Sequence, residues 1–435
     1  MVWRIGALLL FLGVLPLRAA GGPQDSRISL AELIQRPFVE LMALTEDDAY
    51  PKSEIKALRS SLEDDRRLQL EASRKAEKAW LRELKEAQKE LQSLNAASSR
   101  DSASVASHRE QLHQKIARLE KDIRDEKKQQ EVGIPLTFEI KLAKVHVIER
   151  WPAKRREIMD RIDRGEARSR KHGDVEDIGY RKWIKGQEQD IAVGDQTVRQ
   201  IMAGGGMPLE STDQDVQAYV RNLAVRIAMN SDLKIPLRVA VLDNPQARAV
   251  ALPGGYLFVT SGLIVTAENE AELAGELSRE IARVAARQGT RRTKLSIMKK
   301  MIVPAAQITT GFFTGGVTNA GAYYSMSYGF QGLSSLVDHS LQGSSEKLQR
   351  EADQLGIQYA WKAGFDPSGF VAYIDALSLN TESPAAGNLF QPKSGLERRI
   401  MDAFTEIQYL PPQERTIKDS VDFYVAKHAL TSRGD

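Results

Sequence analysis

The stretch Leu277-Ser-Arg-Glu-Ile-Ala-Arg-Val-Ala-Ala-Arg-Gln-Gly289 decides the fold of this chain. We expect it to continue a helix that begins at Asn269, because Glu272 follows three residues later as in an N-terminal capping box. Apolar side chains recur at helical spacing and predict one buried stripe, formed by Leu273, Leu277, Ile281 and Val284. Charged side chains share a second face, formed by Glu276, Arg279, Glu280, Arg283 and Arg287. What this helix does depends on how those charges are neutralised.

Length and composition place the chain among ordinary globular proteins. Its 435 residues are enough for two or three domains, and 42% apolar residues can form a normal core. The 61 basic and 58 acidic residues nearly cancel to a net charge of +3, which argues against a nucleic-acid partner. Because the sequence has no cysteine, disulfides, a thiolate nucleophile, cysteine metal ligands and a lipid-modified cysteine anchor are excluded.

The first 21 residues look like an export signal. Arg4 supplies the positive charge, residues 5–17 form a mostly apolar run, and Ala19-Ala-Gly21 offers small residues for cleavage. The run is too short to span a bilayer comfortably, so we expect a signal peptide, cleaved near Gly21, and export to the periplasm or the extracellular space. An uncleaved anchor is the alternative, because Arg4 and the amino terminus carry the only charges before the run. Residues 22–52 are expected to be a linker with a short helix near Leu30–Met42.

Residues 53–131 are rich in Glu, Lys, Arg, Gln, Leu and Ala, and their apolar positions predict a coiled-coil arm. Two runs step alternately by four and three residues: Trp80, Leu84, Ala87, Leu91 and Leu94, then Leu112, Ile116, Leu119 and Ile123. A polar breaker at 95–104 separates them and favours an antiparallel helical hairpin. A parallel coil between two copies of the chain, or a solvated charged helix without a partner, is the alternative.

Two stretches border the expected globular domain. Residues 132–182 are expected to be a connector, and residues 411–435 a C-terminal tail. Within the connector, apolar residues alternate as in a strand while their flanks are helical in composition: Leu136, Phe138, Ile140 and Leu142. The secondary structure of this segment therefore stays open at this point.

Residues 183–410 are expected to form a compact α+β domain. Alternating apolar residues predict strands at 237–242 and 256–260, and Pro-Gly-Gly at 253–255 predicts a turn. Residues 302–335 are rich in glycine and small apolar residues but too interrupted for a membrane helix. They are expected either to line an apolar groove or to touch a membrane surface.

Five blocks of the region 183–400 follow the order and spacing of a known family: residues 187–194, 248–255, 269–275, 349–353 and 363–367. The second block reads Arg-Ala-Val-Ala-Leu-Pro-Gly-Gly, and the fourth reads Gln-Arg-Glu-Ala-Asp. By these blocks the region resembles the HtpX and CAAX-prenyl-endopeptidase family of zinc metallopeptidases, the gluzincins. The resemblance implies a mainly helical, zincin-like α+β domain with a small β-sheet, a zinc cofactor and proteolytic activity.

The departures from that family fall where its members hold zinc. Members carry His-Glu-x-x-His on a helix, where two His one turn apart face the metal and the Glu activates a water. The resemblance places Arg279 and Arg283 at the two His, and Gln349 at the third ligand, the first Glu of Glu-x-x-Ala-Asp. Arginine offers no lone pair and keeps its charge. No zinc cofactor is therefore expected, and Glu280 is left as a vestigial general base.

The resemblance also assigns a role to Asp353, which in relatives supports the metal site from outside the ligand set. It should approach from a facing helix, and we expect Arg279 and Arg283 to pair with Glu280 and Asp353 in place of zinc. The alternative is an exposed stripe of ion pairs, each contributing about 0.2–0.5 kcal/mol.

The edge formed by Leu252, Pro253, Gly254 and Gly255 is the expected peptide-binding element. In the resembling fold an extended peptide is accepted there by strand addition, which needs no zinc. A purely structural turn is the alternative.

We therefore expect an exported pseudopeptidase of the cell envelope that binds or scaffolds a protein or peptide partner. The arm would give a second interaction surface or a site of self-association. An active zinc metalloendopeptidase with ligands not yet identified is one alternative, and a structural coiled-coil protein whose globular part is a folded anchor is the other.

Overall fold

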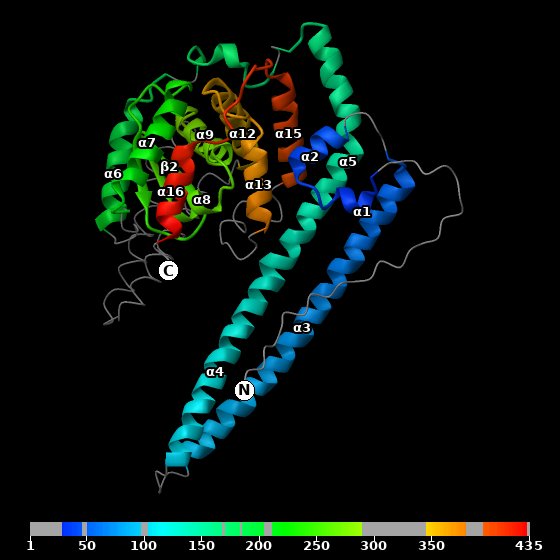
Figure 1. Ribbon diagram of the computed structural model, residues 1–435, viewed down its shortest axis with the longest axis vertical. Helices are drawn as coiled ribbons and strands as arrows, with labels where there is room; N and C mark the ends of the chain where they lie inside the picture. Colours follow the sequence, from blue (N-terminus) through cyan, green and yellow to red (C-terminus); the bar gives the residue numbers. More distant parts are fainter. Residues whose placement is uncertain are drawn as a thin grey trace.

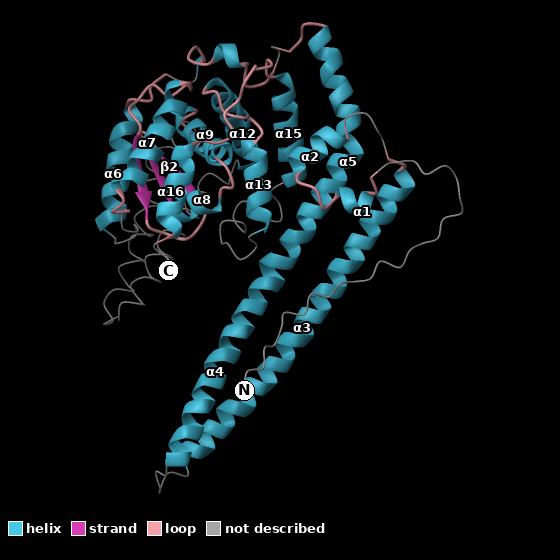
Figure 2. Cartoon of the chain, in the orientation of Figure 1, coloured by secondary structure: helices cyan, strands magenta, loops and turns pink. Residues whose placement is uncertain are grey.

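The molecule divides into a long helical arm and a globular body (Figures 1 and 2). The computed structural model describes residues 28–45, 50–96, 103–167, 170–182, 185–203, 211–288, 345–379 and 395–432. The body is mainly helical with one small sheet and follows a helical arm, which confirms the predicted fold class. The expected signal peptide and the stretch 302–335 lie outside the described residues. Within the described ranges, no helix has the length and apolar character needed to cross a bilayer.

Two long helices run side by side in opposite directions along the arm (Figure 1): α3 (Lys52–Ala96) and α4 (Ala103–Lys128). All residues of the two predicted apolar runs are buried or half-buried, whereas most residues between them are exposed. Polar contacts also join the pair, with His108 Nε2 3.0 Å from Glu90 Oε1 and Lys127 Nζ 3.8 Å from Glu77 Oε1. The arm is therefore a hairpin within one chain, and pairing with a second copy stays a prediction.

The second arm helix continues into the body. A π-helical turn, η1 (Gln129–Gly133), joins α4 to α5 (Ile134–Asp163). Pro135 lacks an amide hydrogen and would crowd the carbonyl four residues earlier in a regular helix, and the wider π turn accommodates it. The alternating apolar residues at 136–142 are helical after all. They alternate because α5 is covered on several sides, by α3, α2 (Phe38–Leu44) and α15 (Leu396–Tyr409).

The stretch expected to be a linker contains α1 (Leu30–Leu33), which packs on α3, and α2, which packs on both α5 and α13. The Phe38 N–H donates to Asp375 Oδ2 at 2.7 Å. Trp151 of α5 donates its Nε1 hydrogen to a backbone carbonyl of α2 at 3.1 Å. Burial raises the pKa of Asp375 to about 6, although Lys144, 3.7 Å away, favours its charged form. Arm and body are thus joined through core packing.

The sheet has three strands in the order β1 (Arg238–Leu242), β3 (Tyr256–Thr260), β2 (Ala249–Leu252). β1 is parallel to β3 and β2 is antiparallel to it, which leaves β2 at an edge. One face of the sheet packs on α7 (Gln214–Met229) and α9 (Glu270–Ala285), and the other meets Val198 of α6 (Gln189–Ala203). Both strands expected from the sequence are present.

The helix with the charged face, α9, lies at the centre of the body. It is surrounded by α7, α12 (Ser345–Lys362) and α13 (Gly369–Leu379), and every residue of it except Arg283 is buried. The helices cross closely at glycines. A Cβ added to Gly356 would lie 2.8 Å from the backbone nitrogen of Arg279, and one added to Gly275 would lie 2.5 Å from that of Phe370. The charged face expected on this helix is therefore inside the protein.

The first turn of α9 is capped by two chain segments. Asn269 Oδ1 accepts from the Glu272 N–H at 3.0 Å, as expected for a capping box. In a regular capping box the Glu272 carboxylate would accept from the Asn269 N–H, but here it accepts from the Glu268 N–H at 2.9 Å. From the C-terminal side, the Lys418 carbonyl accepts from the Ala271 N–H at 3.0 Å. The following helix, α16 (Val421–Thr431), packs on α7 and on α8 (Ser261–Thr266). This part of the expected tail is therefore a structural element of the body.

Replacing Gly356 by alanine should destabilise the body, because the added methyl group would press on the backbone of Arg279. We expect a loss of about 1–3 kcal/mol in the free energy of unfolding, measured by urea denaturation. Lys362→Ala, at an exposed position of the same helix, is the control and should change stability by less than about 0.5 kcal/mol. If both variants were equally stable, the crossing of α9 and α12 would not be tight.

Stability should also fall as pH rises through the titration of Glu272. Burial raises the pKa of Glu272 from 4.5 to about 7, so between these values the unfolded chain releases this proton while the native protein retains it. The resulting loss is at most about 3 kcal/mol, and less where solvent screens the carboxylate. Urea denaturation of wild type and Glu272→Gln at about pH 5 and about pH 8 isolates this group. At the higher pH the variant should gain stability relative to wild type. A stability difference that does not change with pH would contradict the raised pKa of Glu272.

Candidate functional site

Four side chains on one face of α9 neutralise one another in the interior: Glu276, Arg279, Glu280 and Arg283, here called the buried quartet. Arg279 binds Glu276 through two contacts, 2.9 Å from Nε to Oε2 and 2.7 Å from Nη2 to Oε1. Its Nη2 also lies 3.0 Å from Glu280 Oε1, and Arg283 Nη1 lies 3.2 Å from that same oxygen. The four side chains are between 2% and 16% exposed, so they are not the exposed stripe considered as an alternative.

The second carboxylate oxygen of Glu280 joins the helix to the sheet. It accepts a hydrogen bond from the Ala251 N–H at 3.0 Å. In an antiparallel pair, the backbone groups of every second residue bond to the partner strand. Next to β2, the Arg248 carbonyl is such a group, because it accepts from the Thr260 N–H of β3. The amide of Ala251, three positions further along β2, therefore points to the outer edge of the sheet. Glu280 caps that edge.

Burial and mutual attraction act in opposite directions on the pKa values of the buried quartet. Burial raises the pKa of Glu276, and Arg279 only partly offsets this. Burial acts on Glu280 in the same direction, but Arg283, Arg279 and the Ala251 N–H outweigh it and lower the pKa of Glu280. Burial would lower the pKa of Arg279, whereas the two glutamates raise it well above its usual value. Two guanidinium groups and two carboxylates leave no formal net charge.

The residues at the three positions that the family resemblance assigns to zinc ligands do not have the chemistry of zinc ligands. Arg279 and Arg283 present donors without a lone pair, and Gln349, half-buried on α12, offers a neutral amide oxygen. One guanidinium about 5 Å from a dication would repel it by on the order of 6 kcal/mol at an effective dielectric constant of about 20. Across the described residues, no group of three or more His, Cys, Asp or Glu is arranged to hold a metal ion.

Asp353 is held by a residue that sequence reasoning missed. Arg399 of α15 binds its carboxylate through two bonds, 2.7 Å from Nε to Oδ2 and 3.0 Å from Nη2 to Oδ1, and both side chains are almost fully buried. The expected ion pairs of Arg279 and Arg283 with Glu280 are present, whereas the ion pair that the structure shows for Asp353 is with Arg399. This partner lies 46 residues further along the chain, and such a distant pair leaves no periodic signal in the sequence.

Arg287 does not belong to the charged row expected on this helix. α9 ends at Ala285, and Arg287 adopts a left-handed backbone conformation with φ of 53°. Its guanidinium binds the Asp190 carboxylate through two bonds of 2.8 Å. Arg287 thus fastens the end of α9 to α6, and it is separate from the buried quartet.

The expected peptide-binding residues Leu252, Pro253, Gly254 and Gly255 lie where β2 turns into β3. Leu252 is only 1% exposed. A Cβ on Gly254 would lie 2.9 Å from Ile191 Cα of α6, and one on Gly255 would lie 2.2 Å from the Pro236 carbonyl oxygen. Both glycines also have positive φ, 82° and 86°. Intramolecular packing therefore encloses the turn, and peptide binding there stays a prediction.

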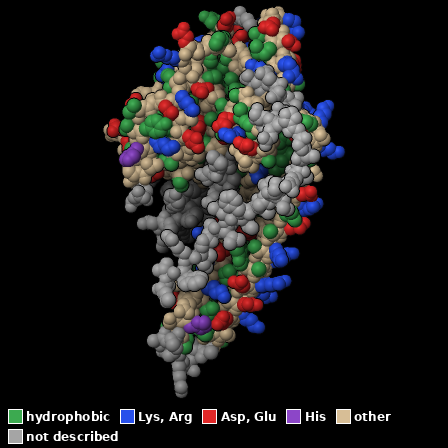
Figure 3. All heavy atoms as spheres, turned by 45° about the vertical axis from the view of Figure 1, so that its right-hand side comes forward, with side chains coloured by type: hydrophobic (Ala, Val, Ile, Leu, Met, Phe, Trp, Pro, Cys, Tyr) green, Lys and Arg blue, Asp and Glu red, His purple; other side chains and the backbone are tan. Residues whose placement is uncertain are grey.

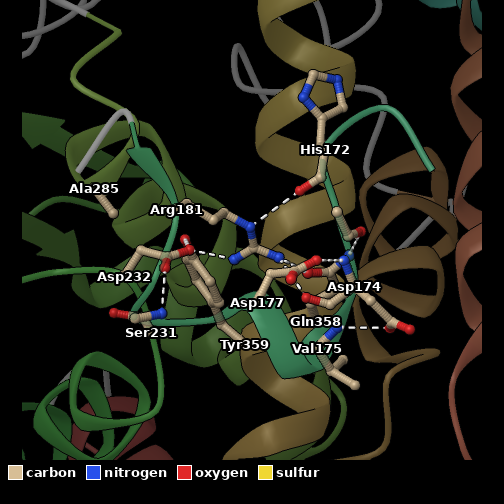
Figure 4. A network of polar contacts seen from close by, with 12 residues as sticks. His172, Asp174, Val175, Asp177, Arg181, Ser231, Asp232, Ala285, Gln358 and Tyr359 are labelled. Carbon is tan, nitrogen blue, oxygen red and sulfur yellow. Dashed lines mark hydrogen bonds and ion pairs between the residues drawn. The ribbon is translucent and has the colours of Figure 1, made fainter. Parts of the chain in front are cut away.

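A second buried polar cluster holds the segment around η2 (Val175–Asp177) against the body (Figure 4). Arg181 forms an ion pair with Asp232 and a hydrogen bond with Gln358 of α12. The Tyr359 hydroxyl donates to Asp232 Oδ2 at 2.6 Å, and burial raises the pKa of Tyr359 well above its usual value. These groups satisfy one another, so the cluster is a structural clamp. It includes the end of the expected connector.

Comparison with known proteins finds relatives of the domain. Residues 210–407 match the model of Peptidase family M48, so this region of the chain is similar to that family. The Beta-barrel assembly-enhancing protease of Escherichia coli (strain K12) is 27% identical over 246 residues, which cover 55% of this chain and 47% of that protein. The protein of the same name in Yersinia pestis is 28% identical over 254 residues, covering 55% and 48%. The Putative beta-barrel assembly-enhancing protease of Vibrio cholerae serotype O1 is 26% identical over 253 residues, covering 57% and 49%. The chain spans about half the length of these curated relatives.

Removing Arg279 should cost more stability than removing Arg283. Arg279→Met leaves Glu276 and Glu280 buried without their shared cation, which should cost about 3–5 kcal/mol in the free energy of unfolding. Arg283→Met, at the more exposed end of the buried quartet, should cost less. Urea denaturation near neutral pH measures both losses.

A double variant keeps this comparison informative even if Arg279→Met fails to fold. Glu276→Leu combined with Arg279→Met removes a carboxylate together with its cation and should recover part of the lost stability. If Arg279→Met were no more harmful than Arg283→Met, the buried quartet would not be a stabilising unit.

Proposed function

We propose that this chain is a pseudopeptidase: its domain similar to peptidase family M48 keeps the fold, an internal ion-pair network replaces the metal chemistry, and the protein binds or scaffolds a partner. The observation that carries the proposal is the position of Arg279. Its guanidinium is paired with Glu276 and Glu280. All three residues belong to the helix that holds zinc in the resembling family. Arg283 stands at the second ligand position and pairs with the same Glu280.

Hydrolysis of the family type needs a metal that lowers the pKa of a bound water and a carboxylate that can take its proton. Glu280 could act as that base only by giving up its contacts with Arg279, Arg283 and the Ala251 N–H. Gln349 cannot replace the negative charge of a third ligand. We therefore infer that no zinc is bound and that Glu280 has a structural role.

Two alternatives belong to other functional classes. An active zinc metalloendopeptidase is what the family would suggest, but it needs three lone-pair donors, and of the three ligand positions only Gln349 has a lone pair, on a neutral amide oxygen. A structural protein is favoured by the arm, whose first helix alone has 45 residues. In that alternative the body would only anchor the arm.

We favour a protein or peptide partner in the cell envelope. The matched relatives are named for enhancing β-barrel assembly, and a related role in handling exported proteins is our proposal for this chain. Location in the periplasm or outside the cell rests on the expected signal peptide. Partner binding would use the exposed arm, and self-association through the arm is the second option.

Elemental analysis of the purified full chain tests the proposal directly. We expect zinc far below one ion per chain and no chelator-sensitive cleavage of casein, because the ligand positions carry arginine. Stoichiometric zinc together with hydrolysis that a chelator abolishes would overturn the proposal and establish the metalloendopeptidase.

Restoring the ligands tests whether the scaffold is otherwise intact. Arg279→His, Arg283→His and Gln349→Glu, combined with Glu276→Leu to avoid a stranded carboxylate, should bind zinc measurably tighter than wild type. The matched control carries Glu276→Leu and Gln349→Glu with both arginines retained, and it should gain no zinc affinity. Equal zinc binding by the two variants would show that the arginines do not decide metal binding.

A further inference from the structure

The outer face of α3 carries a row of basic side chains, here called the basic row: Arg67, Arg74, Lys78, Lys85 and Lys89. Successive members are spaced by 7, 4, 7 and 4 residues, the spacing that keeps side chains on one face of a helix. All five are exposed. The apolar residues that face α4 lie on the opposite side of the helix, so the basic row points away from the hairpin seam.

Most of the positive charge in the basic row is not neutralised within the molecule. Arg67 lies 2.9 Å from Asp64, in a pair whose side chains are 67% and 57% exposed and which is therefore weak. Among the residues that the structure describes, Arg74, Lys78, Lys85 and Lys89 form no ion pair. Glu71 is the acidic residue that falls on the same face. An excess of positive charge thus faces solvent.

The geometry suits contact with a flat surface. From Arg67 to Lys89 the basic row is about 33 Å long, at about 1.5 Å per residue. A straight helix touches a plane along one line, and all members lie close to that line. Leu81, 42% exposed, stands between Lys78 and Lys85 and adds an apolar contact. In Figure 1 α3 lies on the side of the arm away from the body, and Figure 3 shows Lys and Arg side chains along this edge.

We propose that the basic row binds the anionic headgroups of a phospholipid membrane surface and lays the arm along it. This inference rests on the proposed location in the cell envelope. A specific protein partner would be expected to meet an aromatic anchor, and the basic row contains none. A nucleic-acid ligand is disfavoured by the net charge of only +3. A membrane surface presents many negative charges in a plane, which matches a linear row of cations.

Vesicle co-sedimentation of the full chain tests the proposal. Vesicles of phosphatidylglycerol and phosphatidylcholine should bind the chain more tightly than vesicles of phosphatidylcholine alone, and added salt should remove the difference. Any insertion of the apolar N-terminal run contributes to both vesicle types and cancels in the comparison. Arg74→Glu, Lys78→Glu and Lys85→Glu together should weaken the anionic-vesicle binding by more than about 100-fold, at about fivefold per charge removed.

The matched control reverses three exposed charges of α4, of which Lys115 lies on a different face from the other two: Lys115→Glu, Lys121→Glu and Arg124→Glu. It has the same net charge as the test variant and should keep most of the anionic-vesicle binding. Equal loss in both variants, or no preference of wild type for anionic vesicles, would overturn the proposal. So would retention on immobilised polyaspartate without vesicle binding, which would indicate an acidic protein partner. None of these outcomes bears on zinc content, so failure of this inference and failure of the pseudopeptidase proposal are distinguishable.

Discussion

The contacts of Arg279 with Glu276 and Glu280 are the constraint around which the body is arranged. Buried charges are tolerated only when they are neutralised and hydrogen-bonded, and here the cation and both anions belong to the same helix. That helix is enclosed by the sheet and by α7, α12 and α13. At Gly356 the backbone of α12 approaches that of Arg279, so α9 cannot shift outward to expose its charges. Close packing and charge neutralisation therefore depend on one another.

Features encoded by local patterns were predictable, whereas long-range partners were not. The start of α9 at Asn269, both predicted strands and the two arm helices follow from periodicity and capping. Three determining contacts join distant residues: Asp353 with Arg399, Ala251 with Glu280, and Ala271 with Lys418. None has a spacing that a single sequence could reveal. The helix α5 was obscured for another reason: it is buried on several sides, so its apolar residues lost the 3.6-residue period.

The same packing explains how the arm is held. The helix α5 belongs to both parts of the molecule, because it continues α4 and also packs on α2 and α15. Trp151 at its centre is fully buried, meets Phe404 edge to face at 5.3 Å and bonds to the backbone of α2. A segment that composition marked as a connector is therefore core. A partner or surface bound along the arm would be positioned relative to the body by this junction, without a flexible linker between them.

The presence of Glu280 illustrates why one motif residue is weak evidence for activity. In a metal site a glutamate at this position would take a proton from water, yet here the same carboxylate accepts from two arginines and from the edge of β2. Removing Glu280 would leave the buried guanidinium of Arg279 with one carboxylate fewer to neutralise it. It would also leave the Ala251 N–H at the sheet edge without its acceptor. These contacts give the glutamate a structural role that is independent of catalysis. The flanking side chains decide the chemistry, because only they determine whether a lone pair or a permanent cation faces the position of the metal.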